Sequence, residues 1–244
     1  MDILEFQNMF EVEDQHWWFK GKRGIIKYLL QAELKPGRRA LDFGCGCGAI
    51  LKSLSREVEV EGVDISRTAI DFCRQRGLKN VMVIKLDQWR PKPDYYDLII
   101  ISDVLEHVEN DLALLRKLYS ALRQGGILLA TVPAFNFLWS NHDLILHHKR
   151  RYTRPALIKA ARQAGFDWSF ISYYNFWLFL PVLAVRTFRK LFRPASTKSD
   201  TIPIPGRLMN KIFYLIFKSE QYFLKKLVFP FGVSLIAITR KRSF

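Results

Sequence analysis

The 244-residue chain contains only three cysteines, Cys45, Cys47 and Cys73. An odd and small number of cysteines excludes a disulfide framework and favours a reducing compartment. No positively charged segment followed by an apolar run stands at the N-terminus, so no secretory signal is recognisable and we expect the protein in the cytoplasm. A long apolar run is also missing. The most apolar segment, residues 173–185, is shorter than the roughly 20 residues of a membrane-spanning helix and is interrupted by Pro181.

Acidic residues are scarce in the C-terminal part of the chain. Residues 1–145 contain 19 Lys and Arg against 20 Asp and Glu, giving a net charge of −1. Residues 146–244 contain 19 against 3, giving +16, so the whole formal excess of +15 lies there. Charge concentrated in this way indicates an anionic partner, either a membrane surface or nucleic acid, and does not by itself indicate a fold.

Short apolar runs alternate with segments of helical spacing through most of the chain. The alternation predicts an α/β fold with a doubly wound parallel sheet, because parallel neighbours need crossover connections and helices usually supply them. The ligand crevice of such a sheet lies beyond the C-terminal ends of its strands. We predict strands at residues 39–43, 58–63, 81–86, 97–101, 127–132, 165–174 and 232–241.

Composition divides the chain into four parts. We predict an N-terminal helical cap over a cofactor at residues 1–34 and a core domain at residues 35–174. Residues 175–231 form an aromatic and basic insertion between the last two strands, and residues 232–244 supply the final strand and a basic tail. Within the insertion, residues 196–206 are expected to form a loop because they are rich in Pro and Ser.

The segment A-L-D-F-G-C-G-C-G-A-I, residues 40–50, allows three hypotheses. It fits a dinucleotide pattern ending at Ala49, a G-x-G-x-G pattern, or a metal pair formed by Cys45 and Cys47. Two cysteines with no matching second pair are a poor metal site, so we expect them to fill a tight turn. The glycines of both cofactor patterns are Gly44, Gly46 and Gly48.

Acidic residues at three strand ends decide between the two cofactor hypotheses. Asp64 follows the first glycine by about twenty residues, where an acid holds ribose hydroxyls in several adenosine cofactors. Asp42 would oppose a pyrophosphate but could hold an ammonium group or a water molecule, which suits a cofactor that carries an amino acid. Asp87 could accept the exocyclic amine of adenine. A nicotinamide cofactor would need neither Asp42 nor Asp87.

These segments together resemble the class I S-adenosylmethionine-dependent methyltransferases. The resemblance covers roughly residues 35–174 and 232–241 and rests on L-D-F-G-C-G-C-G, V-D-I-S, L-D, Y-D-L-I-I-I-S-D-V-L-E-H-V and G-G-I-L-L-A-T-V-P in order. It implies a Rossmann-like sheet and S-adenosyl-L-methionine as cofactor. The cofactor contacts that it implies are Gly44, Gly46 and Gly48 at the methionine part, Asp64 and Ile65 at the ribose, Asp87 and Gln88 at adenine, and Ser102 and Asp103 near the sulfonium.

Two further segments resemble a bacterial and archaeal subset of these enzymes. They are H-W-W-F-K-G-K-R at residues 16–23 and an H-K-R-R-Y-T segment that ends at Thr153. Members of this subset often accompany cell-envelope glycan or lipid-linked sugar pathways. The resemblance implies that one of the adjacent tryptophans, Trp18, covers the cofactor. Arg23 could pair with the methionine carboxylate.

Methyl transfer from a sulfonium is an in-line displacement that needs mainly alignment and exclusion of water. A base helps only where a hydroxyl or amine must lose a proton. We predict His107 as this base, because imidazole titrates near neutrality, with Glu106 and His148 as further catalytic candidates. A Glu-His pair can also hold a metal, as in quinone-ring O-methyltransferases that share L-E-H-V. No further ligand is recognisable, so we expect no metal.

Basic and aromatic residues follow the fifth predicted strand. Two arginines, Arg150 and Arg151, could grip a phosphate or carboxylate of the acceptor together with Tyr152, because guanidinium presents a planar fork to such groups. His142 is a weaker candidate for the same wall. The alternative is a solvated basic turn before a helix.

The insertion contains an amphipathic pattern at residues 207–229. Its lysines at positions 211, 218 and 225 recur every seven residues and so lie along one face. A helix with basic and bulky apolar faces is typical of a membrane interface, where anionic lipids add to binding. The alternatives are a helix packed on its own domain or on a partner subunit, and RNA binding, which would space single aromatics among polar residues. The apolar face predicted here comprises Leu208, Ile212, Leu215, Ile216 and Phe223.

The sequence thus predicts a methyltransferase bound peripherally to the inner face of the cell membrane. Its acceptor would be a lipid or a lipid-linked glycan or phosphate, methylated mainly on oxygen. Three alternatives remain open: a soluble methyltransferase acting on RNA or a small molecule, an NAD-dependent oxidoreductase, and a non-catalytic module that binds the cofactor.

Overall fold

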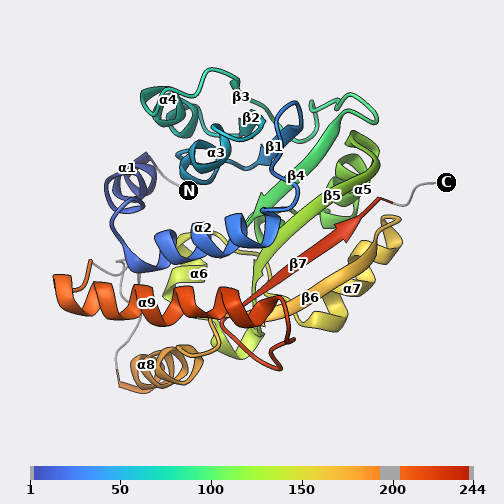
Figure 1. Cartoon of the computed structure of the whole chain (residues 1–244). Helices are drawn as coiled ribbons and strands as arrows, with labels where there is room; N and C mark the ends of the chain where they lie inside the picture. Colours follow the sequence, from blue (N-terminus) through green and yellow to red (C-terminus); the bar gives the residue numbers. More distant parts are fainter. Residues whose placement is uncertain (1–2, 193–203, 242–244) are drawn as a thin grey trace.

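A computed structural model of the chain describes residues 3–192 and 204–241. Its centre is a seven-stranded sheet with strand order β3-β2-β1-β4-β5-β7-β6 (Figure 1). Because β1, β2, β3, β4 and β5 are parallel neighbours, the alternation of strands and helices read from the sequence is confirmed. The strands are β1 (Arg39–Phe43), β2 (Glu59–Asp64), β3 (Val81–Val83), β4 (Tyr96–Ser102), β5 (Leu122–Pro133), β6 (Asp167–Tyr174) and β7 (Ser234–Arg240).

The sheet is mixed, which corrects the prediction of a parallel one. Strand β7 runs antiparallel to both β5 and β6. Tyr174, the last residue of β6, pairs with Ser234, the first residue of β7. The insertion therefore returns the chain to the end of the sheet that it left, and β7 can only run back in the opposite direction.

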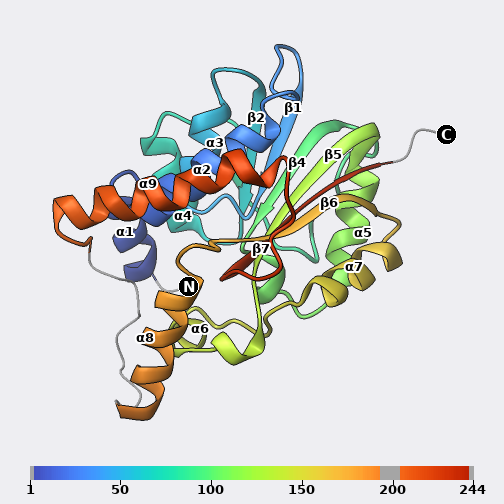
Figure 2. The same ribbon diagram turned by 60° about the horizontal axis from the view of Figure 1, so that its bottom comes forward.

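Helices cover both faces of the sheet, and in Figure 2 the sheet separates α2, α3 and α9 from α5 and α7. The middle strand β4 is buried along almost its whole length, as its run of apolar residues predicts. The helices are α1 (Ile3–Val12), α2 (Trp17–Leu30), α3 (Ala49–Leu54), α4 (Arg67–Gln75), α5 (Asp111–Ala121), α6 (Asn141–Ile145), α7 (Arg154–Gln163), α8 (Phe179–Phe192) and α9 (Arg207–Leu224), with 3₁₀ turns η1 (Leu105–His107) and η2 (Asn136–Leu138).

The N-terminal helices and the insertion pack on each other. The indole of Trp17 on α2 contacts the rings of Phe213 and Phe217 on α9. A Cβ atom at Gly21 would lie 2.4 Å from the Phe217 ring, so this glycine allows the two helices to approach closely. The sequence places α2 and α9 in separate parts of the chain, but in space they form one layer over the sheet.

Strand β3 is shorter than the sequence predicts. Only Val81–Val83 pairs with β2, and the chain then leaves the edge of the sheet. The predicted loop at residues 196–206 lies outside the described residues up to residue 203. Among the described helices, none combines the length and the apolar character that crossing a membrane requires.

Candidate active site

The glycine-rich segment forms the tight turn between β1 and α3. Gly44, Gly46 and Gly48 have φ angles of 76°, 53° and 82°, in the left-handed region that favours glycine. A Cβ atom at Gly44 would lie 2.3 Å from the side chain of Val104, and one at Gly48 would lie 2.7 Å from Leu78. These glycines are thus required both by the backbone and by close packing.

The cysteines around this turn are buried and free. The sulfur of Cys47 lies 3.4 Å from the carbonyl oxygen of Phe6, and the sulfurs of Cys45 and Cys73 lie 3.8 Å apart. Burial raises the pKa of the Cys47 thiol above its ordinary value, which keeps it protonated and unreactive. The side chains fill space beside the turn.

Asp42, at the C-terminal end of β1, is a buried carboxylate without a partner. Its side chain is 1% exposed, and neither oxygen has a hydrogen-bond partner among the described residues. Burial raises the pKa of this carboxyl to about 7, against the opposing effect of the Lys22 ammonium. An unsatisfied buried acid is costly, and a bound ammonium group would satisfy it. This geometry fits a cofactor that carries an amino group.

Asp64 ends β2 and holds the glycine turn in place. One carboxylate oxygen accepts a hydrogen bond from the backbone N–H of Gly46 and the other from the N–H of Ser66, each at 2.9 Å. Ile65 beside it is 71% exposed. These two hydrogen bonds fix the position of the Asp64 carboxylate. Its contact with the ribose, which the sequence predicts, would be a second role of the same side chain.

Asp87 and Gln88 do not stand at a strand end as the sequence predicts. Because β3 ends at Val83, both lie in a following turn and are exposed. Their contact with adenine stays a prediction, which would need this turn to approach the crevice.

Asp103 follows β4 and receives two contacts that the sequence does not reveal. Its side chain forms an ion pair with Lys22 of α2, and its other oxygen accepts from the hydroxyl of Thr131 at 2.9 Å. Ser102 is linked to the same hydroxyl at 3.0 Å. The Lys22 ammonium also lies 4.9 Å from the centre of the Trp18 ring. Lys22 thus links α2 to the end of β4. In the sequence, the only indication of this role is that Lys22 belongs to the H-W-W-F-K-G-K-R segment.

The adjacent tryptophans divide their roles. Trp17 packs against α9, whereas Trp18 lies beside Lys22 at the end of β4. The side chain of His16 caps α2 by accepting from the N–H of Trp18 at 3.2 Å. The arrangement leaves Trp18 as the tryptophan for the predicted contact with the cofactor.

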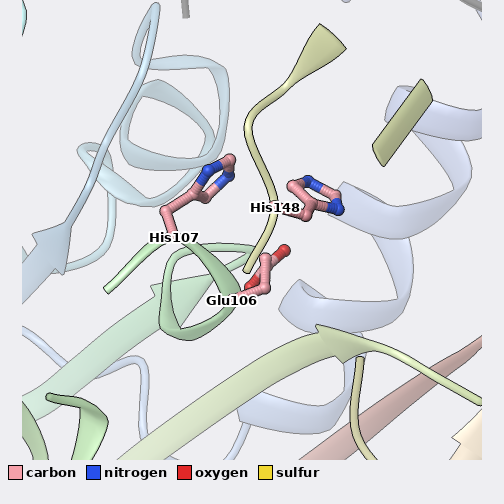
Figure 3. Close-up of side chains that lie close together, drawn as sticks. All are labelled: Glu106, His107 and His148. Carbon is pink, nitrogen blue, oxygen red and sulfur yellow. The ribbon is translucent and has the colours of Figure 1, made fainter. Parts of the chain in front are cut away.

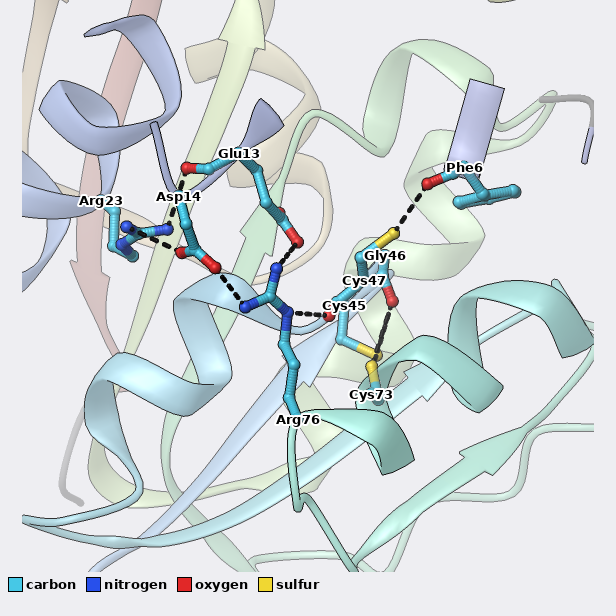
Figure 4. A network of polar contacts seen from close by, with 9 residues as sticks. All are labelled: Phe6, Glu13, Asp14, Arg23, Cys45, Gly46, Cys47, Cys73 and Arg76. Carbon is cyan, nitrogen blue, oxygen red and sulfur yellow. Dashed lines mark hydrogen bonds and ion pairs between the residues drawn. The ribbon is translucent and has the colours of Figure 1, made fainter. Parts of the chain in front are cut away.

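Helix α1 is fastened over the glycine turn by the network in Figure 4. The Arg76 guanidinium donates to the carbonyl of Cys47 at 2.8 Å and pairs with Glu13 and Asp14, which follow α1. Arg23 also belongs to this network, since its guanidinium lies 3.2 Å from a carboxylate oxygen of Asp14. These contacts draw Arg23 toward the α1 end, and its predicted pairing with a methionine carboxylate has to compete with them.

His148 lies close to the adjacent Glu106 and His107 although it belongs to another segment of the chain (Figure 3). One potential ligand atom from each lies within 4.8 Å of the others. The backbone N–H of Lys149 donates to the carbonyl of Glu106 at 2.8 Å, which holds the two segments side by side. The three predicted catalytic candidates therefore form one cluster past the end of β4.

Arg151 and Tyr152, predicted to grip an anionic acceptor, are both engaged by protein groups, and a contact with the acceptor would have to compete with these partners. The buried Arg151 guanidinium donates to both oxygens of Asp143, at 2.8 and 2.9 Å, and to the carbonyl of Ala134. The hydroxyl of the buried Tyr152 donates to Asp111 at 2.7 Å.

Arg150 is also engaged by protein groups. Its guanidinium donates to the backbone carbonyl of Glu109 at 2.8 Å and lies 3.2 Å from a carboxylate oxygen of Asp111. His142 lies near the cluster, with its ring centre 6.0 Å from that of His148. Of the side chains predicted to contact the acceptor, Arg150 and Arg151 are therefore engaged in ion pairs, whereas His142 and His148 lie close to each other near the end of β4.

The sequence matches the model of a family described as a methyltransferase domain over residues 15–178. It is 30% identical over 146 residues to phosphoethanolamine N-methyltransferase 3 of Arabidopsis thaliana, covering 55% of this chain and 30% of that one. It is 26% identical over 189 residues to the ubiquinone biosynthesis O-methyltransferase of Marinobacter nauticus, covering 65% and 79%. The chain spans less than half the length of several of its curated relatives.

Solved structures share the fold. A SAM-dependent methyltransferase from Archaeoglobus fulgidus superposes with a TM-score of 0.57 at 23% identity, covering 90% of this chain and 94% of that one. Phosphoethanolamine N-methyltransferase 2 of Haemonchus contortus, in complex with S-adenosyl-L-methionine, gives 0.57 at 18% identity, covering 90% and 52%. At these identities the likeness shows the fold.

Proposed function

Because this chain belongs to the methyltransferase-domain family, we propose that it transfers the methyl group of S-adenosylmethionine to a lipid or lipid-linked acceptor at a membrane surface. The donor side is the crevice formed by the glycine turn, Asp42 and Asp64. Asp42 offers a buried carboxylate to the ammonium of the methionine part, and Asp64 lies at the strand end that suits a ribose.

The acceptor part of the proposal is supported by α9, which is apolar on two opposite faces. One face packs into the fold through Phe213, Phe217 and Leu224. On the opposite face Leu208 is 72% exposed and Leu215 is 54% exposed. Packing on its own domain therefore accounts for only one of the two apolar faces. A membrane interface would bury the other.

The lysines of α9 stand between these two faces, as a surface helix requires. Lys211 and Lys225 are exposed, and the Lys225 ammonium lies 4.2 Å from the centre of the Tyr28 ring on α2. Basic residues flanking an apolar face attract anionic lipid headgroups. Helix α9 thus has an exposed apolar face flanked by lysines, which is the arrangement of helices that lie in a membrane interface.

Helix α8 also carries exposed apolar side chains. Leu180, Phe188 and Leu191 are all more than half exposed. In Figure 1 α8 and the N-terminal part of α9 reach beyond the end of the sheet toward which β4 points, where the candidate site is. We propose that the enzyme binds peripherally to the cytoplasmic face of the cell membrane through these helices and receives its acceptor there.

The proposed reaction is methylation of an acceptor oxygen. A bond forms between this oxygen and the methyl carbon while the bond from the methyl carbon to sulfur breaks. Its electron pair stays on sulfur and yields S-adenosylhomocysteine. The acceptor hydroxyl must also lose its proton, to a base or to solvent. His107, the predicted base, is poorly suited to take it unaided, because burial and the neighbouring His148 lower its pKa to about 4.

A labelled-methyl assay tests this function. The full chain is incubated with S-adenosylmethionine carrying a labelled methyl group and, separately, with a bacterial lipid extract, a water-soluble extract and total RNA. We expect label in the organic phase of the lipid reaction only. Label confined to the water-soluble products or to RNA would contradict the lipid acceptor while keeping methyl transfer.

Binding of S-adenosylhomocysteine should weaken as the pH falls through about 7. The pKa of Asp42 is raised to about 7 in the free protein, so its carboxyl becomes neutral below this pH and no longer attracts the ligand ammonium. The dissociation constant should rise by up to about tenfold per pH unit. Calorimetry between about pH 5.5 and pH 8.5 measures this.

The matched control for this experiment is Asp42→Asn. Lys22, Asp64 and Glu13 also face Asp42, and the acids among them titrate too. The variant should bind weakly at every pH with a flatter profile. An unchanged profile in Asp42→Asn would assign the pH dependence to these neighbours and contradict the role of Asp42.

A further inference from the structure

We propose that Glu106, His107 and His148 bind a divalent first-row transition metal ion such as Zn²⁺. Their potential ligand atoms lie within 4.8 Å of one another, so one ion between them could contact all three after small side-chain movements. Two imidazoles and a carboxylate form a ligand set that suits Zn²⁺ and its neighbours in the first transition row.

The fold brings the three side chains together from two segments. Glu106 and His107 lie in the turn η1 after β4, and His148 lies in the loop after α6. The centres of the two imidazole rings are 4.7 Å apart, and the rings are nearly perpendicular. In Figure 3 the Glu106 carboxylate extends from below toward the space beside His148. His148 is the third ligand that the local pair Glu106-His107 lacks in the sequence.

Glu106 is the strongest indication that something positive belongs here. Its side chain is fully buried, and neither carboxylate oxygen has a hydrogen-bond partner among the described residues. The cations nearest to it are already paired, Lys22 with Asp103 and Arg151 with Asp143. A buried carboxylate without a partner is costly, and a bound cation would offset that cost.

His148 is held as a metal-binding histidine usually is. The Nδ1 atom of His148 lies 2.8 Å from a carboxylate oxygen of Asp143, which leaves Nε2 as the free ligand atom. Asp143 is itself fixed by both donors of Arg151. The ring of His107 packs against that of His148, with the ring centres 4.7 Å apart. A carboxylate or carbonyl behind a histidine fixes its tautomer and orientation toward a metal.

Three protein ligands leave coordination positions open. An acceptor hydroxyl could occupy one of them, and a metal lowers the pKa of a bound hydroxyl so that its proton passes to solvent at neutral pH. This use of the ion rests on the proposed function, whereas the binding of the ion does not.

The test uses the full chain without a histidine tag, stripped of metal with a chelator. Co²⁺ is titrated in alone and its visible absorption is followed, and Zn²⁺ retained after dialysis is measured by mass spectrometry. We expect about one equivalent of either ion per chain and a Co²⁺ spectrum of low-symmetry coordination. Absence of bound Co²⁺ and of retained Zn²⁺ in the native chain would overturn the proposal.

Single substitutions locate the ion. Glu106→Gln, which preserves shape, and His148→Gln should each weaken Co²⁺ binding by at least about 100-fold. His147→Asn is the matched control, since His147 is an exposed neighbour with a φ of 55° that asparagine tolerates, and it should bind Co²⁺ like the native chain. Native-like binding by Glu106→Gln would overturn the proposal.

Calorimetry with S-adenosylhomocysteine on the same variants separates the two proposals. Retained binding shows that a variant is folded and that the methyl-donor site is intact. Loss of Co²⁺ binding with retained S-adenosylhomocysteine binding supports the metal site alone. Failure of the native chain to bind S-adenosylhomocysteine while it binds Co²⁺ would count against the proposed function and not against the metal.

Discussion

Replacement of Asp64 by alanine should abolish measurable binding of S-adenosylhomocysteine. The substitution removes the acid placed for the ribose hydroxyls and also the acceptor for the N–H groups of Gly46 and Ser66. Two ribose hydroxyls would donate to this carboxylate, and each lost hydrogen bond to a charged group costs about 1.5–3 kcal/mol, so binding should weaken by about 100-fold or more. Isothermal titration calorimetry on the native and variant chains measures the change.

Two further variants interpret that result. Asp71→Ala removes an exposed acid whose partner is Arg74, and it should leave binding unchanged within about twofold. Asp64→Asn keeps one acceptor oxygen and should bind with intermediate affinity. Undiminished binding by Asp64→Ala, or binding of a nicotinamide dinucleotide by the native chain, would contradict the assignment of this crevice.

Neutralising the lysines of α9 should detach the protein from anionic membranes. The triple variant Lys211→Gln, Lys218→Gln and Lys225→Gln removes three charges that each contribute about 1 kcal/mol at an anionic surface. The partition coefficient onto phosphatidylserine-containing liposomes should therefore fall by about 100-fold. Co-sedimentation at low salt measures it, and neutral liposomes should bind the native chain more weakly.

The control for this experiment carries the same loss of charge on another surface. Arg154, Lys159 and Arg162 lie on α7, on the opposite side of the sheet from α9 in Figure 2. Their replacement by glutamine should leave co-sedimentation largely unchanged. A native chain that stays in the supernatant, or an equal loss in both triple variants, would contradict docking through α9. A stable dimer in which the exposed face of α9 is buried would instead favour a partner subunit.

The glycine turn of the proposed donor site could be predicted because it depends on local rules. Residues 40–50 combine a strand, a tight turn and a helix, and only glycine adopts the three left-handed conformations of that turn without strain. Asp42 and Asp64 follow from the same logic, because strand ends of a parallel sheet meet at one edge. Asp87 does not lie at a strand end, because the edge strand β3 already ends at Val83.

The partners of the residues proposed for the acceptor side could not be predicted, because they depend on how charged side chains pair in the folded chain. The sequence suggests that Arg150 and Arg151 bind an anion. In the fold, however, Arg150 pairs with Asp111 and Arg151 pairs with Asp143. Lys22 carried no signal of its own and proves to be the partner of Asp103. A charged side chain is available to a ligand only when no protein group takes it, and that is a property of the tertiary structure.

The sequence by itself therefore determined the α/β fold through its periodicity, and the methyltransferase family through the resemblance of its ordered motifs. It also predicts the residues of a methyl-donor site from glycine conformation and strand ends. Only the tertiary structure decided which residues share a site. It turned β7 antiparallel, packed α9 on α2 with its opposite apolar face exposed, and brought His148 to Glu106. The reason is that contacts between residues far apart in the chain form only when packing and the burial of charge have settled the whole fold.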